Sequence, residues 1–228
     1  MILALALTWK GLVRLLKADL HIHTKYSMDC DMSLEKIINR CAEIGINCIA
    51  IADHGTIEGA VEMRKLAPFP VIIAEEILTP YGEIMGMFLE EGIPSGLSAE
   101  ETISRIRDQG GLVCIPHPFD ALRQSALNSG EVETMAEQID IVEVFNARTI
   151  LLRYSTQALT FARKYGIPGS AGSDAHIPAE IGNAYVEMSE FNGKDDFIQA
   201  LTGGKISGHK TNPLIHFGTA WARLKKRF

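Results

Sequence analysis

The sequence predicts a single-domain α/β fold with a mainly parallel sheet, whose seven or eight strands can close into a barrel. Short apolar runs rich in Ile and Val alternate along the chain with amphipathic segments. The runs do not alternate in polarity, which is typical of strands that are covered on both faces. No linker or internal repeat interrupts the 228 residues, a length that one barrel domain can fill.

Eight apolar runs are expected to form strands. They span residues 18–23, 47–53, 70–76, 83–88, 112–117, 139–145, 169–173 and 184–188. Five amphipathic segments between them are expected to form helices. They span residues 33–42, 57–66, 98–109, 151–165 and 195–201. Ser33 and Ser98 are candidate N-caps, and Gly45 and Gly166 are expected to end the first and fourth helices.

The composition excludes several classes of protein. Hydrophobic residues make up 46% of the chain and charged residues 22%, which is ordinary for a globular protein and unlike a disordered, collagenous or coiled-coil chain. Lys and Arg number 22 against 28 Asp and Glu, and the net charge of −6 disfavours a DNA-coating protein. The four cysteines form no Cys-x-x-Cys pair, which predicts free thiols and a cytoplasmic location.

The two ends of the chain are expected to lie outside the main domain. Residues 1–16 are interpreted as an N-terminal extension, because a compact fold can begin at Lys17. Their apolar start is shorter than the about 20 residues of a membrane span. Residues 17–212 form the expected main domain, and residues 213–228 are expected to form a basic C-terminal helix. No contact with a membrane is expected, and the sequence leaves the oligomeric state open.

Most of the histidines fall at or just after the ends of expected strands. Five of the seven do so, namely His21, His23, His54, His117 and His176. Four strand ends also carry carboxylates, at Asp19, Asp53, Glu75-Glu76 and Asp174. Each motif alone is common in proteins without a ligand, but their joint occurrence favours one cluster, because the ends of parallel strands meet on one face of a barrel. Imidazoles and carboxylates together are the ligand set for Zn, Mn or Fe.

Four motifs resemble those of the PHP family, the polymerase and histidinol phosphatase superfamily. They are Asp19-Leu20-His21-Ile22-His23-Thr24, Ala52-Asp53-His54-Gly55, Ile115-Pro116-His117-Pro118 and Gly172-Ser173-Asp174-Ala175-His176. The resemblance covers about residues 17–190 and implies a distorted (β/α)7 barrel that binds two or three divalent metal ions. It also implies that residues 17–212 are a PHP phosphoesterase domain.

The resemblance assigns candidate ligands to each metal ion. His21, His23, Glu76 and Asp174 match the ligands of the first metal, with Glu76 bridging to the second. His117 matches a ligand of the second metal, and His54 and His176 match ligands of the third. Asp29 falls where some members place another ligand of the third metal. Glu75 competes with Glu76 for the bridging role, since the expected strand register does not separate them.

One position departs from the family pattern. Many members have a histidine in the next strand, where this chain has Glu83 in the run Gly82-Glu83-Ile84-Met85-Gly86. A carboxylate is a harder ligand than imidazole and would shift the preference from Zn toward Mn or Fe. We expect Glu83 to bind metal; the alternatives are a weakened second site or a solvated residue at the strand end.

The substrate-binding residues are less marked in the sequence. Arg148 follows an expected strand and is the first candidate for binding phosphate, because a guanidinium group binds phosphate oxygens in pairs. Lys25 is the second candidate, and Arg123 is a weaker one. Asn146 either orients a ligand or caps the next helix.

The leading hypothesis is a metal-dependent phosphatase that hydrolyses a small phosphate ester, either a phosphomonoester or a nucleotide-like compound. A metal-bridging hydroxide would attack phosphorus while Glu76 and Asp174 hold the metals, and His54 or His176 would protonate the leaving oxygen. One alternative is an exonuclease-type phosphodiesterase that acts on short nucleic acid. The other is a non-catalytic metal-binding module.

Overall fold

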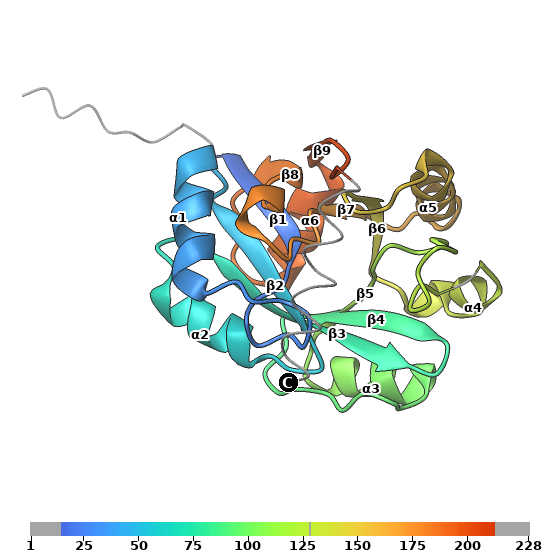
Figure 1. Cartoon of the computed structure of the whole chain (residues 1–228). Coiled ribbons are helices and arrows are strands. Elements are labelled where there is room, and N and C mark those ends of the chain that lie inside the picture. The colour runs from blue at the N-terminus through green and yellow to red at the C-terminus, as the bar shows by residue number, and fades with distance from the viewer. Residues whose placement is uncertain (1–14, 128, 213–228) are drawn as a thin grey trace, which may run out of the picture.

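A computed structural model describes residues 15–127 and 129–212 of the chain (Figure 1). Its strands are β1 (Leu15–Ile22), β2 (Cys48–His54), β3 (Val71–Thr79), β4 (Gly82–Met87), β5 (Leu112–Ile115), β6 (Ile141–Asn146), β7 (Gly169–Gly172), β8 (Ala184–Ser189) and β9 (Lys205–Gly208). Its α-helices are α1 (Leu34–Ile44), α2 (Glu58–Leu66), α3 (Ala99–Asp108), α4 (Ser129–Thr134), α5 (Leu152–Tyr165) and α6 (Lys194–Thr202). Two short 3-10 helices span Ala136–Gln138 and Pro178–Glu180.

The strands form one curved sheet in the order β7-β6-β5-β4-β3-β2-β1-β8-β9. The sheet nearly closes between β1 and the residues after β7, where Ile22 and Ala175 form a parallel bridge. Two backbone hydrogen bonds extend this bridge, from His23 N to Ala175 O at 3.0 Å and from Asp174 N to His21 O at 2.7 Å. The expected barrel of β1 to β7 is therefore confirmed.

The expectation of a mainly parallel sheet is wrong for two parts of the sheet. β1, β2 and β3 run parallel, and so do β5, β6 and β7, but β4 is antiparallel to both of its neighbours. β8 is antiparallel to β1, and β9 is antiparallel to β8. The physical reason for β4 is its connection: only Pro80 and Tyr81 separate it from β3, and two residues can join a hairpin but cannot make a parallel crossover.

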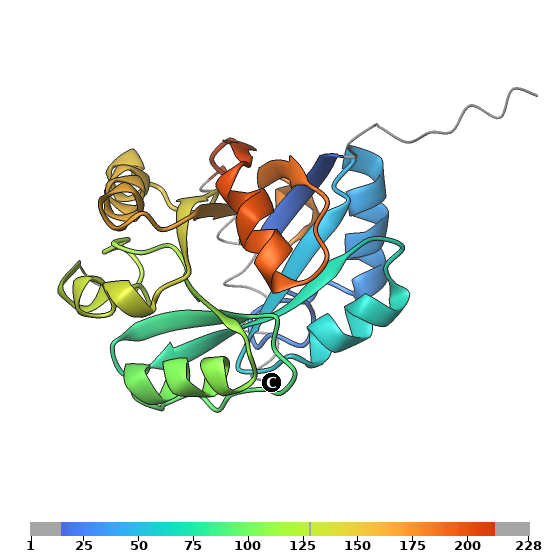
Figure 2. The same ribbon diagram turned by 180° about the vertical axis from the view of Figure 1, so that it is seen from behind.

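α6 packs against the apolar cluster of the inner face through Phe197, Ala200 and Leu201, whereas the other helices lie on the outer face of the sheet (Figures 1 and 2). Between them and the sheet lies a core of large apolar side chains, which includes Ile49, Ile51, Ile73 and Ile77. The inner face of the barrel carries smaller or more flexible apolar side chains. They include Cys48, Ala50, Ala52, Ala74, Met85, Met87 and Cys114.

The inner face changes from apolar to ionisable along each strand. On β2, the inward residues Cys48, Ala50 and Ala52 are followed by His54, and on β3 the inward Ile72 and Ala74 are followed by Glu76. His54 pairs with Glu76 across the two strands. The apolar residues thus fill the closed end of the barrel, and the ionisable side chains gather at the other end.

Eight strands and five helices match the sequence-based expectation, whereas β9 and α4 were not expected. β1 begins at Leu15, and Leu16 is buried, so two residues of the expected extension belong to the first strand. Residues 1–14 and the expected C-terminal helix at 213–228 lie outside the described residues. Within the described ranges, every helix is too short or too polar to cross a lipid bilayer.

Candidate metal centre

The strand ends bring all nine candidate metal ligands into one cluster. The ends of the parallel strands and the beginning of the antiparallel β4 lie at the same edge of the sheet, so Glu83 joins the cluster from the opposite chain direction. The nine residues are His21, His23, Asp29, His54, Glu76, Glu83, His117, Asp174 and His176. Eight of them are buried, and the side chain of His54 is 19% exposed.

The first group is centred on two imidazoles from β1. The Nε2 atoms of His21 and His23 are 3.1 Å apart. Oε2 of Glu76 lies 3.3 Å from Nε2 of His21 and 3.4 Å from Nε2 of His23. Oδ1 of Asp174 lies 3.4 Å from Nε2 of His23. These are the four side chains expected to bind the first metal.

Glu76 also contacts the second group, through its other oxygen. Its Oε1 lies 3.0 Å from Nε2 of His117, and this nitrogen is 3.6 Å from Oε2 of Glu83. Oε1 of Glu83 lies 3.4 Å from Nδ1 of His54. Glu76 is thus placed between two groups of potential ligands, whereas Glu75 points to the outer face and accepts a hydrogen bond from Ile93 N at 2.9 Å.

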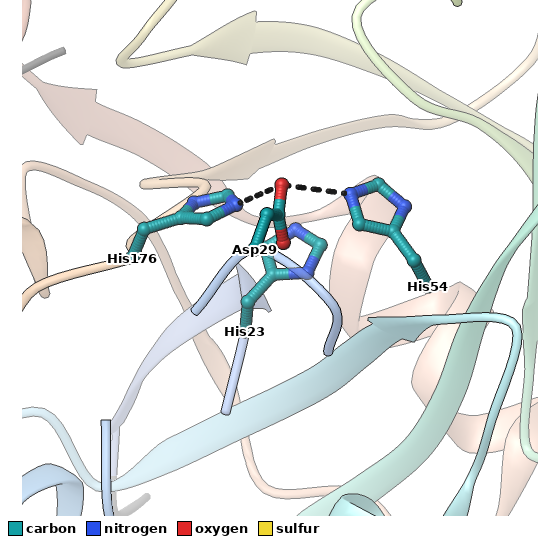
Figure 3. Close-up of side chains that lie close together, drawn as sticks. All are labelled: His23, Asp29, His54 and His176. Atoms are coloured by element: carbon teal, nitrogen blue, oxygen red, sulfur yellow. Dashed lines mark ion pairs between the residues drawn. The ribbon is translucent and has the colours of Figure 1, made fainter. Parts of the chain in front are cut away.

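The third group contains Asp29, which lies between His54 and His176 (Figure 3). Oδ2 of Asp29 is 3.1 Å from Nε2 of His176 and 3.5 Å from Nε2 of His54. The ring of His23 stands beside both, with its centroid 4.3 Å from that of His176 and 4.7 Å from that of His54. Ligand atoms of these four residues lie within 4.8 Å of one another.

The distances between the facing atoms fit divalent cations. Metal–ligand bonds of about 2.1 Å place neighbouring ligand atoms about 3.0–3.4 Å apart in octahedral and tetrahedral shells. The facing nitrogens and oxygens of His21, His23, Glu76 and His117 are 3.0–3.4 Å apart. Mixed imidazole and carboxylate ligands suit Zn, Mn and Fe. The donor set therefore fits more than one ion.

The pKa values in this cluster are shifted by burial and by the charges of the neighbouring side chains. Burial alone would lower the pKa of His23, but Asp174 and Glu76 raise it to about 10. Burial and the negative charge of Glu76 raise the pKa of Glu83. Burial and the nearby His23 lower the pKa of His176 to about 4. A cation bound here would take the place of protons on the histidines.

Glu143 is a functional residue that the motifs did not reveal. Its Oε1 lies 3.1 Å from Nδ1 of His21, so a proton on Nδ1 leaves Nε2 as the ligand atom. Its Oε2 accepts hydrogen bonds from His117 N at 2.7 Å and from Asn146 Nδ2 at 3.0 Å. A charged residue inside the apolar run 139–145 was the available signal, because a buried charge requires partners.

The carboxylates of Asp19 and Asp53 hold the backbone around the cluster. Asp19 accepts hydrogen bonds from Ser173 N at 2.8 Å and Gly182 N at 2.9 Å, which ties β1 to the end of β7. Asp53 accepts from the backbone N of Thr24 at 2.6 Å and from its hydroxyl at 2.7 Å. Burial raises the pKa of Asp19 to about 6. Both residues act on the position of the ligands rather than as ligands.

The backbone is in the left-handed region at two ligands, His117 with φ 27° and Asp174 with φ 55°. Non-glycine residues seldom adopt such values, and they concentrate at functional sites. Gly172 precedes Asp174 and has a different role, because a Cβ there would collide with Cβ of His21. The glycine thus allows β7 to approach β1 and closes the cluster.

Two arginines border the cluster. Nη1 of Arg148 lies 2.6 Å from Nδ1 of His176, and its Nε lies 3.3 Å from Oε1 of the buried Glu180. Nη2 of Arg123 lies 2.7 Å from Oδ2 of Asp174. Asn146 donates to the same oxygen at 3.3 Å. Asn146 therefore orients a candidate ligand, and the alternative role as helix cap is wrong, since Leu151 is the N-cap of α5.

A cavity of about 1290 Å³ opens above the cluster. It is lined by Tyr26, Ser27, Met28, Asp29, His54, Glu76, Leu78, Glu83, Ser95, Leu122, Arg123, Gln124, Ser125, Arg148, Asp174 and His176. Both arginines line it, so Arg123 is better placed for substrate than its sequence context suggested. Lys25 is not among the lining residues; it is exposed, with Nζ 5.5 Å from the ring centroid of Tyr26.

A nearly closed α/β barrel with a metal-ligand cluster at one end is the class of protein that the fold and site define. Residues 19–69 match the family model of the PHP domain, and residues 153–206 match the PHP-associated model. The uncharacterised protein MJ0417 of Methanocaldococcus jannaschii is 37% identical over 182 residues, which cover 78% of this chain and 72% of that protein. The chain belongs to the PHP family.

Solved structures show the same fold at low sequence identity. One is a two-domain protein from Bacteroides vulgatus, described as containing a predicted PHP-like metal-dependent phosphoesterase. It has a TM-score of 0.70 and 16% identity, and the match covers 86% of this chain and 65% of that one. Another is an amidohydrolase from Chromobacterium violaceum with bound SO4 and no metal. It has a TM-score of 0.60 and 16% identity, with 72% and 89% covered.

Proposed function

We propose that the protein is a metal-dependent phosphatase that hydrolyses a small phosphate monoester. The observation that carries this proposal is the meeting of metal-ligand groups and two guanidinium groups in one cavity. The PHP family and the phosphoesterase description of the Bacteroides protein support the same class of reaction.

The metal ions would be held by the groups described above. His21, His23, Glu76 and Asp174 would hold one ion, and Glu76, His117 and Glu83 a second; His54, His176 and Asp29 offer a third position. When bound, divalent cations neutralise the charge of a phosphate ester and make hydroxide accessible near neutral pH. The carboxylate of Glu83 beside the bridging carboxylate of Glu76 favours Mn or Fe over Zn at the Glu83 position.

Arg123 and Arg148 would bind the phosphoryl oxygens. Both side chains line the cavity, and each is fixed by a buried carboxylate, Arg123 by Asp174 and Arg148 by Glu180. Fixed guanidinium groups stabilise charge in the transition state without having to reorient. The two arginines come from different segments of the chain, Arg123 from the loop after β5 and Arg148 from the turn after β6.

The leaving oxygen needs a proton, and the two candidate histidines differ in their ability to supply it. His176 has a pKa lowered to about 4, so its imidazole is neutral near pH 7. Burial alone would lower the pKa of His54, but Asp29 and Glu76 raise it. His54 is also partly exposed to the cavity. We therefore assign proton donation to His54 when only the first two ion positions are filled, and a holding role to His176. When the third position is filled, His54 would hold that ion instead.

The remaining expectations belong to the same proposal. All four cysteines are buried free thiols, which supports a reducing, cytoplasmic location. A short nucleic acid is the alternative substrate and a metal-binding module the alternative function. A small phosphorylated compound is favoured, because Arg123 and Arg148 are the only Lys or Arg side chains among the described residues lining the cavity.

Metal-supplemented turnover of phosphate esters tests the proposal. The protein, purified without chelators, is assayed with an aryl phosphate and with a labelled trinucleotide, with and without added Mn²⁺. We expect metal-dependent release of phosphate from the aryl ester. Asp174→Asn should abolish most of it while retaining the fold, because Asn tolerates the left-handed backbone. Turnover of neither substrate would favour the binding module.

A further inference from the structure

The walls of the cavity differ in character between its base and its mouth. The charged lining residues of the described chain are candidate ligands and the two arginines, which are buried except for the partly buried His54 and Arg123. The other lining residues are uncharged, and four of them are apolar or aromatic. We call these four side chains the apolar rim: Tyr26, Met28, Leu78 and Leu122.

Three members of the rim are large aliphatic side chains with high exposure. Met28 is 71% exposed, Leu122 is 59% exposed and Leu78 is 47% exposed. A single exposed apolar residue is common on protein surfaces and needs no explanation. Three that converge on one cavity from three separate segments form a patch of the kind that marks a binding site.

Met28 is held in place by a residue of the metal-ligand cluster. Met28 lies between Ser27 and Asp29, which are both buried, and the hydroxyl of Ser27 donates to Asp29 at 2.9 Å. Asp29 in turn lies between His54 and His176 (Figure 3). The backbone around Met28 is therefore fixed, although its side chain is exposed.

Leu78 and Leu122 are anchored in similar ways. Leu78 lies on β3 two residues after Glu76, so both side chains lie on the inner face, and it pairs with Glu83 of β4. Leu122 N donates to Oδ1 of the buried Asp120 at 3.3 Å. Asp120 also contacts Arg123, which reaches Asp174. One loop thus supplies both a phosphate-binding candidate and a rim residue.

We propose that the apolar rim binds an uncharged, apolar leaving group of the phosphate ester. The proposal rests on the proposed function for the phosphate end of the substrate. With the phosphate at the metal ligands and arginines, the ester oxygen points toward the mouth, where only uncharged side chains line the described part of the cavity. A polyanionic oligonucleotide would place further phosphates there, where no Lys or Arg beyond Arg123 and Arg148 lines the described part of the cavity.

A homologous substrate series tests the rim. The probes are phenyl, 4-ethylphenyl and 4-butylphenyl phosphate, whose leaving phenols differ in apolar area but hardly in acidity, together with a 5′-phosphorylated dinucleotide. Burial of one methylene contributes about fourfold to affinity, so partial burial predicts a rise in kcat/KM of roughly tenfold from phenyl to butylphenyl. The rise should come from KM, because binding away from the reacting bond is uniform.

A double variant and a control variant distinguish binding at the apolar rim from a general effect of exposed apolar side chains. In the double variant Met28→Ser/Leu122→Ser, the kcat/KM values should converge across the series. Leu66→Ser is the matched control, since Leu66 is 53% exposed at the end of α2 and does not line the cavity; it should keep the parent slope. A flat series in the parent protein, an unchanged slope in the double variant, or a preference for the dinucleotide would overturn the proposal.

Binding measurements distinguish failure of the rim from failure of the proposed function. Non-hydrolysable 4-alkylbenzylphosphonates are titrated into the metal-loaded protein by calorimetry. If the parent hydrolyses no ester, the phosphatase proposal fails, and the phosphonate series still decides the rim. Affinity that rises with alkyl length in the parent and not in the double variant supports the rim. Affinity independent of alkyl length overturns it.

Discussion

Glu75 and Glu76 are neighbours in the chain, both are buried, and the structure gives them opposite roles. Glu76 lies on the inner face of β3, within 3.4 Å of four imidazoles. Burial would raise its pKa, but the surrounding histidines hold it well below the usual value. Glu75 lies on the outer face, where burial raises its pKa to about 7 and the backbone N of Ile93 lowers it less.

The pleat of β3 thus decides which of two adjacent glutamates faces the metal-ligand cluster. A strand places successive side chains on opposite faces, so a shift of one residue would exchange the two carboxylates. The cross-strand pairing of His54 with Glu76 fixes that register.

The largest expected effect is on Glu76. Glu76→Gln removes a charge shared by two ligand groups and should lower kcat by on the order of a thousandfold, as the loss of a principal charge-stabilising group does. Glu75→Gln, the matched control one residue away, should keep kcat close to the parent value. Steady-state rates with Mn²⁺ check both. Equal losses in the two variants would contradict the assignment.

Glu143 should affect the metal site indirectly, because its carboxylate contacts the candidate ligand His21. Glu143→Gln should weaken metal binding about 10–100-fold, since the partner of a ligating histidine fixes its tautomer. The measurement is chelator competition, which reports affinity independently of turnover. An unchanged affinity for the first-bound ion would show that Glu143 only supports the fold.

Glu83 should show a smaller effect, at the second ion alone. Glu83→Gln should reduce turnover about tenfold and lower the Mn²⁺ affinity of the weaker site, whereas Glu83→His should restore binding and shift the preference toward Zn. Metal stoichiometry and Mn/Zn-dependent rates of both variants check this. If Glu83→Gln binds the same metals and turns over at the parent rate, Glu83 is not a ligand.

The outer-face carboxylate should affect stability rather than activity. The folded-state pKa of Glu75 is raised to about 7, so the folded state binds more protons than the unfolded state between the usual value of 4.5 and that pH. The contribution of Glu75 to the free energy of unfolding should therefore fall as pH rises through this range, by about 1–3 kcal/mol. Glu75→Gln should reduce the change in stability across this range by that amount. Urea unfolding at pH 5 and pH 8 measures it, and a parent slope retained in the variant would be the contrary result.

The sequence predicted the ligand cluster because its residues stand at strand ends in short polar motifs. It could not separate Glu75 from Glu76, since both follow the same apolar run and only the pairing with β2 distinguishes them. The antiparallel β4 was open to prediction, because its connection to β3 is too short for a crossover. Leu122 was not, because its loop has no periodicity and its position depends on Asp120 and Arg123.

Elemental analysis measures directly whether this end of the barrel holds several divalent cations. The folded protein is purified without chelators, supplied with Mn²⁺ and desalted before the measurement. We expect at least two ions per chain, with fewer in Glu76→Gln and the same number in Glu75→Gln. Folded protein that retains no stoichiometric metal, or retains as much in Glu76→Gln as in the parent, would contradict this expectation.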